Sequence, residues 1–260
     1  MISANIITLN EEKNIKECID SVLKVCSEVI VVDSGSSDKT VEIAQKMGAT
    51  VVHQPYLGDG FQKNIAAKHC SNKWVLSIDA DERLDNELIN FISALKLDTA
   101  DIEAYAFRRR NLIGSRWIKY CGWYPDYCIR LYNSEHTQFA QVKQHAKITS
   151  KKVSYIKKDI IHYSYKNIGE LFSKPGRNFS SRGAKIMYQQ GKRANAFSPV
   201  AHGLSALIRK YFFQMGVLGG IDGLSVSLSA GLNSYLKYAK LYEMQNDPKV
   251  MEQQDFDKVW

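Results

Sequence analysis

The sequence is poor in the residues that mark disulfide-bonded, zinc-binding and secreted proteins. Its five cysteines include no C-x-x-C pair: Cys18, Cys26, Cys70, Cys121 and Cys128. An odd number of isolated thiols is typical of reduced, core-filling residues and argues against a disulfide framework or a zinc site. The start, MISANIITLNEE, has neither a basic segment nor a long apolar one, so we expect no secretory signal and a chain that stays in the cytoplasm.

Two glycine-rich nucleotide-binding motifs are also missing. The phosphate loop G-x-x-x-x-G-K-[ST] does not occur, and GDGFQK at 58–63 has only the first two glycines of the G-x-G-x-x-G fingerprint. Hydride transfer from a dinucleotide is therefore disfavoured. A sugar nucleotidyltransferase is disfavoured too, because the basic glycine-rich loop of that class is missing near the N-terminus.

Long uninterrupted apolar runs are absent, and a membrane-spanning helix needs about 20 mostly apolar residues. The segment 211–235 carries one charge, Asp222, but it also holds several glycines and polar residues. Two alternatives stay open for it: an interfacial or partner-facing helical pair, and an ordinary core-packed hairpin.

Charge is unevenly distributed along the chain. Residues 1–100 carry 10 Lys and Arg against 15 Asp and Glu, a net −5, whereas residues 101–260 carry 25 against 12, a net +13. A basic second part suits nucleic acid, anionic lipid or a phosphorylated substrate, and surface solubility would explain it as well.

Short apolar runs alternate with helix-period segments over the first 80 residues. NIIT, EVIVVD, ATVVHQ and WVLSID predict strands, and between them the apolar residues recur every three or four positions, as helices require. Ser36 or Ser37 is expected to cap the second helix and Gly48 to end it. This alternation predicts an α/β fold with a mostly parallel central sheet and helices on both faces.

The pattern changes after a further helix predicted within DADERLDNELINFISAL. AYAFRRRNLIG, CIRLYN, HAKIT and VSYIKKDIIHYSY predict an antiparallel extension of the sheet, and the chain turns helical from Lys166. We therefore expect a catalytic domain over 1–165, a C-terminal helical subdomain over 166–245 that faces the acceptor or a membrane, and a tail over 246–260.

Polar residues gather where the predicted strands end, the edge at which open parallel sheets bind ligands. Asp79 and Asp81 are one residue apart, so in an extended chain both carboxylates point the same way and favour Mg²⁺ or Mn²⁺ between them. With the small hydroxyls, glycines and one lysine at the other strand ends, they suit a nucleotide diphosphate. The nucleotide-sugar set comprises Thr8, Asn10, Glu11, Asp33, Ser34, Gly35, Ser36, Gly60, Gln62, Lys63, Asp79 and Ala80.

Four segments together resemble the family 2 glycosyltransferases of the GT-A fold: ANIITLNEEKNIKECIDSV, VIVVDSGSSDKTVEIA, GDGFQKNIAA and WVLSIDADERLD. GWYPDYCIRLYN is similar to the branch that adds glucose to a heptose of the lipopolysaccharide inner core. The resemblance covers about residues 1–240. It implies an inverting transfer of a hexose, glucose, from a UDP-sugar such as UDP-glucose, with Mg²⁺ or Mn²⁺ as the cation.

The same resemblance implies roles for single residues. Thr8, Glu11 and Asp33 would hold the uridine, and Lys63 would lie near the uracil or phosphate. Asp79 would face the ribose and the metal, and Asp81 would bind the metal directly. His162 is a further candidate metal ligand, with a structural histidine as the alternative.

Inversion needs a base that removes the proton of the acceptor hydroxyl. Relatives often carry Val-His-Glu where this chain reads VKQHAKI, so the glutamate of that motif is replaced by Ala146. Asp126 is the first candidate for the base and His145 the second; a cap or a salt bridge to Arg130 is the structural alternative for Asp126. We assign Trp123, Tyr124 and Arg130 to the acceptor.

The resemblance also gives the positive charge of residues 101–260 a role at the inner membrane, because the anionic lipopolysaccharide core acceptor lies there. We expect a peripheral protein at the cytoplasmic face of that membrane, docked through the C-terminal helices and basic residues: Arg108, Arg109, Arg110, Lys151, Lys152, Lys157 and Lys158. Two alternatives are a transferase of another UDP-hexose to another cell-envelope acceptor, and a non-catalytic protein that binds membrane surfaces or nucleic acid. Nucleic acid is not expected, because carboxylates stand where the strands end.

Overall fold

The computed structural model describes residues 1–97, 101–142, 146–174 and 179–247. The chain divides into two compact units. The first unit comprises residues 1–110 and 125–163, and the second comprises 111–124 and 164–260. The segment 111–124, which the sequence analysis placed in the catalytic domain, thus belongs to the helical unit.

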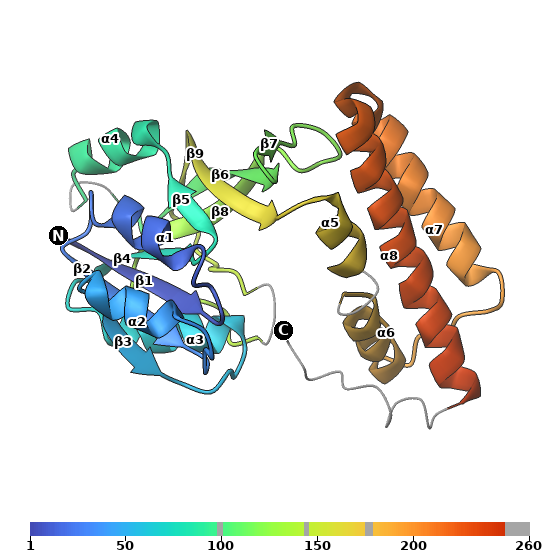
Figure 1. The fold of residues 1–260 in the computed structure, drawn as a ribbon, viewed down its shortest axis with the longest axis horizontal. Coiled ribbons are helices and arrows are strands. Elements are labelled where there is room, and N and C mark those ends of the chain that lie inside the picture. Colours follow the sequence, from blue (N-terminus) through green and yellow to red (C-terminus); the bar gives the residue numbers. More distant parts are fainter. Residues whose placement is uncertain (98–100, 143–145, 175–178, 248–260) are drawn as a thin grey trace. The chain divides into compact units, whose positions relative to one another are not determined.

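Four parallel strands, in the order β3-β2-β1-β4, form the first half of the sheet in the first unit (Figure 1). The strands are rich in β-branched and aliphatic residues, which suits strands that are covered on both faces. Their bounds, with those of the helices that connect them, are β1 Ile2–Thr8, α1 Ile15–Val22, β2 Glu28–Asp33, α2 Thr40–Lys46, β3 Thr50–His53, α3 Asp59–Lys68 and β4 Trp74–Asp79.

The side chains of β4 show that both faces of this sheet are covered. Trp74, Leu76 and Ile78 pack with residues of α1 and α2 in the main core, whereas Val75 packs with Ala67 of α3 and its neighbours. Successive side chains of a strand point to opposite faces. The predicted fold, a mostly parallel sheet with helices on both faces, is confirmed.

The sheet continues beyond β4 in the order β8-β6-β9-β5, with antiparallel pairing of β4 with β8, β8 with β6 and β9 with β5, and β7 also pairs antiparallel with β6. Hydrogen bonds from Ala104 to Lys152 and from Gly114 to Tyr165 show that β6 and β9 run in the same direction. The bounds of these strands, with that of α4, are β5 Glu82–Leu84, α4 Asn86–Ala94, β6 Ala104–Ile113, β7 Arg116–Trp117, β8 Asp126–Asn133 and β9 Val153–Tyr165. The antiparallel extension is therefore confirmed as well. In HAKIT, Ile148 makes only an isolated bridge with Phe139.

Helices build the second unit, with bounds α5 Ile168–Lys174, α6 Ser180–Gln189, α7 Ser198–Ile208, a π-helical turn Arg209–Phe213, a 3₁₀ turn Gly216–Gly219 and α8 Gly220–Asn246. The helices α7 and α8 lie side by side (Figure 1), and Gly203 of α7 lies against Gly231 and Tyr235 of α8. Glycines at this crossing let the two backbones approach closely. Within the described residues no single helix is long and apolar enough to cross a membrane. The segments 198–213 and 216–246, which are bent by 72° at their break, reach that length and composition only when they are taken together.

Local details differ from the sequence expectations in two places. The α2 helix is preceded by Asp38, whose carboxylate accepts a hydrogen bond from the backbone N–H of Thr40, so neither Ser36 nor Ser37 caps it. Gly48 does follow the helix, in a left-handed conformation with φ +81°. In the segment DADERLDNELINFISAL, where a helix was predicted, Glu82 lies in the short strand β5, and the helix α4 follows with Asp85 as its cap, which accepts from the N–H of Leu88.

Candidate active site

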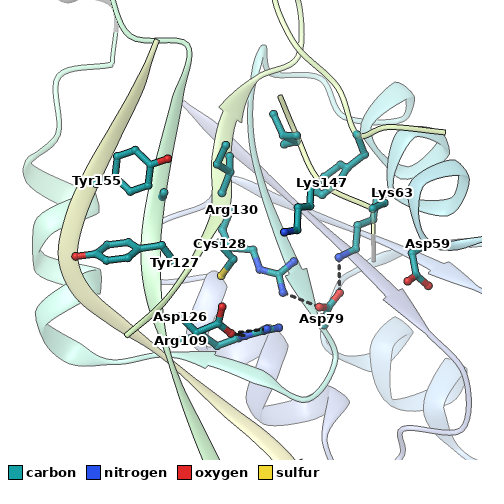
Figure 2. A pocket seen from close by; sticks show the side chains of 15 residues that line it. Asp59, Lys63, Asp79, Arg109, Asp126, Tyr127, Cys128, Arg130, Lys147 and Tyr155 are labelled. Carbon is teal, nitrogen blue, oxygen red and sulfur yellow. Dashed lines mark hydrogen bonds and ion pairs between the residues drawn. The ribbon is translucent and has the colours of Figure 1, made fainter. Parts of the chain in front are cut away.

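A cavity of about 410 Å³ opens in the first unit beside the carboxyl end of β4 (Figure 2). Strands β4 and β8 pair only from Trp74 to Leu76, and beyond Leu76 the two strands have no further paired residues. Charged side chains from both strands line the space next to this point, including Asp79 of β4 and Arg130 of β8. The volume suits a small ligand.

A β-bulge directs Arg130 into this site. Tyr105 of β6 is opposite Leu131 of β8, and Ala106 is opposite Ile129, so Arg130 is the extra, unpaired residue of β8. A bulge breaks the alternation of side chains along a strand and re-aims the residue that it contains. Arg130, whose side chain is only 5% exposed, reaches two carboxylates at once.

Asp79 lies between two cations. Its Oδ1 is 2.7 Å from Nζ of Lys63, and its Oδ2 is 2.6 Å from Nη2 of Arg130 (Figure 2). Burial acts to raise the pKa of Asp79, but the charges of Arg130 and Lys63 outweigh it and hold that pKa well below its usual value. Asp79 therefore stays ionised and fixes both cations at the carboxyl end of β4.

Glu82 continues this network on the other side of Arg130. Its side chain is fully buried, its Oε1 accepts from Arg130 Nη2 at 2.5 Å, and its Oε2 accepts from the backbone N–H of Asp79 at 3.1 Å. Nη1 of Arg109 lies 3.6 Å from the same Oε1. A buried carboxylate requires such partners because an unpaired charge in the interior is very costly.

Asp126, the first candidate for the base, begins β8 and lines the cavity. Its Oδ2 accepts from Nε of Arg109 at 3.0 Å and from Nη2 at 2.6 Å, and the two residues are opposite each other in the β6–β8 ladder. The predicted salt bridge to Arg130 is thus made by Arg109 instead. The side chain of Asp126 is 36% exposed, so a ligand in the cavity can reach it.

Asp81 and His162 form a pair next to this network. Oδ2 of Asp81 lies 3.3 Å from Nε2 of His162, which is brought there by the pairing of β5 with β9. Carboxylate oxygens suit Mg²⁺ and Mn²⁺, and imidazole is a common ligand of divalent transition metals. Among the described residues no cluster of three or more His, Cys, Asp or Glu could hold a metal ion. A cation at this pair would need further ligands, which the oxygens of a bound diphosphate could supply.

This geometry does not support Asp79 as a metal ligand. Both of its oxygens are engaged by cations, whereas Oδ2 of Asp81 lies beside the imidazole of His162. The contacts therefore favour Asp81 over Asp79 as the candidate ligand.

The loops after β1 and β2 hold each other together. Asn10, in a left-handed conformation, donates its N–H to Ser36 and accepts from the N–H of Ser37. The carboxylate of Asp33 accepts from the N–H groups of Gly35 and Ser36, so it orders its own loop. The structure brings these predicted uridine-binding residues to one edge of the sheet, and their contact with uridine stays a prediction. The same holds for Thr8, at the end of β1, and for Glu11, which accepts from Asn14.

The predicted residues of α3 and β4 have mixed roles. A Cβ on Gly60 would lie 1.9 Å from the carbonyl oxygen of Ala140, so that position requires glycine. The amide of Gln62 donates to the Ser34 hydroxyl and to the Gln54 carbonyl, which ties α3 to the neighbouring loops. Lys63 and Asp79 line the cavity, and Ala80, just after β4, is buried with its carbonyl oxygen accepting from Arg83.

Two other predicted residues belong to the second unit. Trp123 stacks on Tyr165 at 5.9 Å, and Tyr124 meets Trp117 edge-on at 5.0 Å. Their assignment to the acceptor stays a prediction. His145, the second candidate for the base, lies outside the described residues.

Sequence reasoning missed several residues that line or support the cavity. Glu82 lies in a segment for which the sequence predicted a helix, and Arg109 was assigned to the basic residues that dock on lipid. Arg108 and Arg110 also bind a carboxylate, that of Asp159, at 2.9 and 2.7 Å. These arginines form ion pairs within the first unit, and their contact with lipid stays a prediction.

A mostly parallel sheet with an antiparallel extension, helices on both faces and a charged cavity at the carboxyl end of a strand is the architecture of the GT-A fold. S. aureus TarS has the same fold: it is 17% identical, with 95% of this chain and 91% of that chain covered and a TM-score of 0.50.

The chain belongs to glycosyl transferase family 2, whose model matches residues 3–161. An uncharacterised glycosyltransferase of Rickettsia typhi is 34% identical over 255 residues, which cover 94% of this chain and 87% of the relative. LpsC of Rhizobium meliloti, a lipopolysaccharide core biosynthesis glycosyltransferase, is 39% identical over 119 residues, or 44% of each protein.

Proposed function

We propose that this glycosyltransferase moves a hexose, glucose, from a UDP-sugar to a heptose of the lipopolysaccharide inner core with inversion at the sugar carbon. The observation that carries the proposal is the cavity in which the Lys63–Asp79–Arg130 network lies beside the Asp81–His162 pair. The partial likeness to LpsC supports a core saccharide as acceptor. Another UDP-hexose or another envelope acceptor is the alternative that a donor screen would reveal.

The donor half of the site is built from three groups. Thr8, Glu11 and Asp33 would hold the uridine at the ends of β1 and β2. Lys63 and Arg130 would face the diphosphate, and Asp79 keeps both cations in place. Asp81 and His162 would hold a Mg²⁺ or Mn²⁺ ion, which when bound would neutralise the charge of the departing diphosphate.

The acceptor half needs a base on the face of the sugar opposite the diphosphate. Asp126 fits this role because it lines the same cavity as Asp79 and keeps part of its surface exposed. Arg109 binds one of its oxygens and fixes the side chain in one orientation. In the proposed transfer, Asp126 takes the proton of the acceptor hydroxyl as that oxygen bonds to the sugar carbon.

The protein would act at the cytoplasmic face of the inner membrane as a peripheral protein. Exposed apolar side chains on α7 and on the residues that flank it support this, and we call them the apolar face: Phe197, Val200, Leu204, Ile208, Phe212 and Phe213. Phe197 and Phe213 are 81% and 80% exposed. Lys192, Arg193 and Arg209 are exposed near the two ends of this face and would favour anionic lipid.

Calorimetry with UDP, with and without Mn²⁺, tests the donor half. We expect UDP to bind more tightly with Mn²⁺, and UDP binding that is absent or indifferent to metal would contradict it. A screen of UDP-sugars with deacylated core oligosaccharide, followed by linkage analysis, then tests the sugar and the acceptor. Transfer from UDP-glucose to a heptose is the expected result, and transfer only from another donor would overturn the choice of glucose.

A further inference from the structure

We propose that Tyr127, Tyr155 and Lys147 form the acceptor subsite of the cavity, a site for a sugar ring that carries a negatively charged substituent. This inference rests on the proposed function, because it assigns the part of the cavity that the donor does not require. The sequence analysis singled out none of these three residues, and placed the acceptor on Trp123, Tyr124 and Arg130.

The two tyrosines form one aromatic wall of the cavity. The ring of Tyr127 meets the ring of Tyr155 at 5.4 Å between centroids and at 76°, an edge-to-face contact. This geometry is favourable for aromatic pairs and limits the orientation of each ring. Tyr155 nevertheless stays 65% exposed, so much of its ring is open to a ligand.

The wall crosses one strand of the sheet. Tyr127 is on β8 and Tyr155 on β9, with β6 between them in the sheet. Strands two places apart are about 10 Å apart, so only long side chains can meet across the middle strand. On β6, Arg108 is opposite Tyr127, and Ala106, which is opposite Ile129, also lines the cavity.

The wall lies next to the candidate base. Tyr127 follows Asp126 in β8, and Figure 2 shows both tyrosines on the side of Asp126 opposite Lys63 and Asp59. A sugar on this wall would therefore lie on the side of Asp126 that faces away from Lys63. Pyranose rings carry a face of C–H groups, which is attracted to the negative face of an aromatic ring. An acceptor hydroxyl could then reach Asp126.

Lys147 gives the subsite its charge preference. Its side chain lines the cavity, is exposed, and points into it in Figure 2. The other three cations of the cavity, Lys63, Arg109 and Arg130, are each paired with an aspartate. No ion pair joins Lys147 to a carboxylate in the part of the chain that the structure describes. Its ammonium group is thus available for a phosphate or carboxylate on the acceptor.

The test is calorimetry on the full chain saturated with UDP and Mn²⁺. The ligand is deacylated inner-core oligosaccharide, used both untreated and after removal of its phosphates. We expect Tyr155→Ala to raise the Kd of the untreated sugar about three- to tenfold, whereas Tyr155→Phe, which keeps the ring, should change it less than twofold. Lys147→Gln should raise the Kd several-fold, and none of the variants should change the Kd of UDP.

The treated sugar identifies the anionic group. If phosphate removal weakens wild-type binding and abolishes the effect of Lys147→Gln, the group is a phosphate; if the effect of Lys147→Gln persists, it is a carboxylate. Tyr155→Ala protein that binds the sugar as tightly as wild type would overturn the subsite, and so would wild-type protein that binds UDP but not the sugar. Failure of wild type to bind UDP would instead contradict the proposed function, and the same sugar titrations without UDP would then test the subsite by itself.

Discussion

Arg130 donates from Nη2 to Oδ2 of Asp79 at 2.6 Å, across the point where β8 leaves β4. The same nitrogen lies 2.5 Å from Oε1 of Glu82, so one buried guanidinium holds two carboxylates. This contact joins the parallel half of the sheet, which carries the donor residues, to the antiparallel half, which carries Asp126.

Removal of Arg130 should strongly destabilise the protein. Arg130→Met leaves Glu82 fully buried without its main partner, and the loss of one member of a buried ion pair costs about 3–5 kcal/mol. Urea unfolding would measure the change. The control is Lys158→Met, which breaks an exposed pair with Glu87 and should leave the midpoint unchanged. An equal effect of the two variants would contradict a special role for Arg130.

Stability should fall in acid partly through Asp79. Its pKa in the folded chain is depressed, so its contribution is complete above the ordinary carboxyl value of about 3.9 and is lost as the pH falls through the lower folded value. Urea unfolding at pH 6 and at pH 3.5 should therefore show a smaller loss of stability for Asp79→Asn than for wild type. Glu28 and Asp38, whose pKa values are also lowered, contribute alike to both proteins. Equal losses would contradict the prediction.

Loss of either member of the Asp81–His162 pair should weaken metal-dependent UDP binding. We expect Asp81→Asn and His162→Ala to raise the Kd of UDP in Mn²⁺ by at least about tenfold. Without metal, the three proteins should bind UDP equally. Tyr163→Phe, next to His162 on β9, is the matched control. If His162→Ala matched wild type, the histidine would be structural.

Asp126→Asn should slow transfer without loss of donor binding. A general base contributes about 10²- to 10⁴-fold to the rate, and the amide cannot take the proton. Steady-state transfer assays with a parallel UDP titration would measure both effects. Arg109→Lys, which keeps the charge but loses the two-nitrogen contact, should cause a smaller loss. Full turnover by Asp126→Asn would rule this residue out as the base.

Removal of aromatic rings from the apolar face should weaken membrane binding. We expect the double variant Phe197→Ser, Phe213→Ser to sediment less with anionic liposomes than wild type, and wild-type binding to weaken with salt. Leu57→Ser changes a 49% exposed leucine of the first unit and serves as the control. Binding that is equal for all three proteins, or absent in wild type, would contradict the proposed docking.

The elements of the first unit were predictable because each is specified by local pattern. EVIVVD and WVLSID form β2 and β4 with the predicted bounds, and VSYIKKDIIHYSY forms β9. The D-A-D motif at the end of β4 was also visible, because the carboxyl end of a parallel strand is a known place for ligands. Such features depend on residues close together in the chain.

The partners of the charged residues were not predictable in the same way. Glu82 and Arg130 are 48 positions apart, and Arg109 and Asp126 are 17 apart. Nothing local distinguishes a buried glutamate from one at a helix start, or a bracing arginine from one on a surface. The bulge at Arg130 depends on the register between β6 and β8, which is set by packing.

The sequence by itself thus determined the α/β fold, the order of its strands and helices and the place of the acidic motif, because hydrophobic period and strand ends are local properties. Only the tertiary structure decided that Asp79 binds two cations, that Asp81 meets His162, and that Tyr127 and Tyr155 meet across β6. These relationships require strands distant in sequence to lie in one register, since a side chain acquires its charge partner and its exposure from neighbours that the chain brings together only on folding.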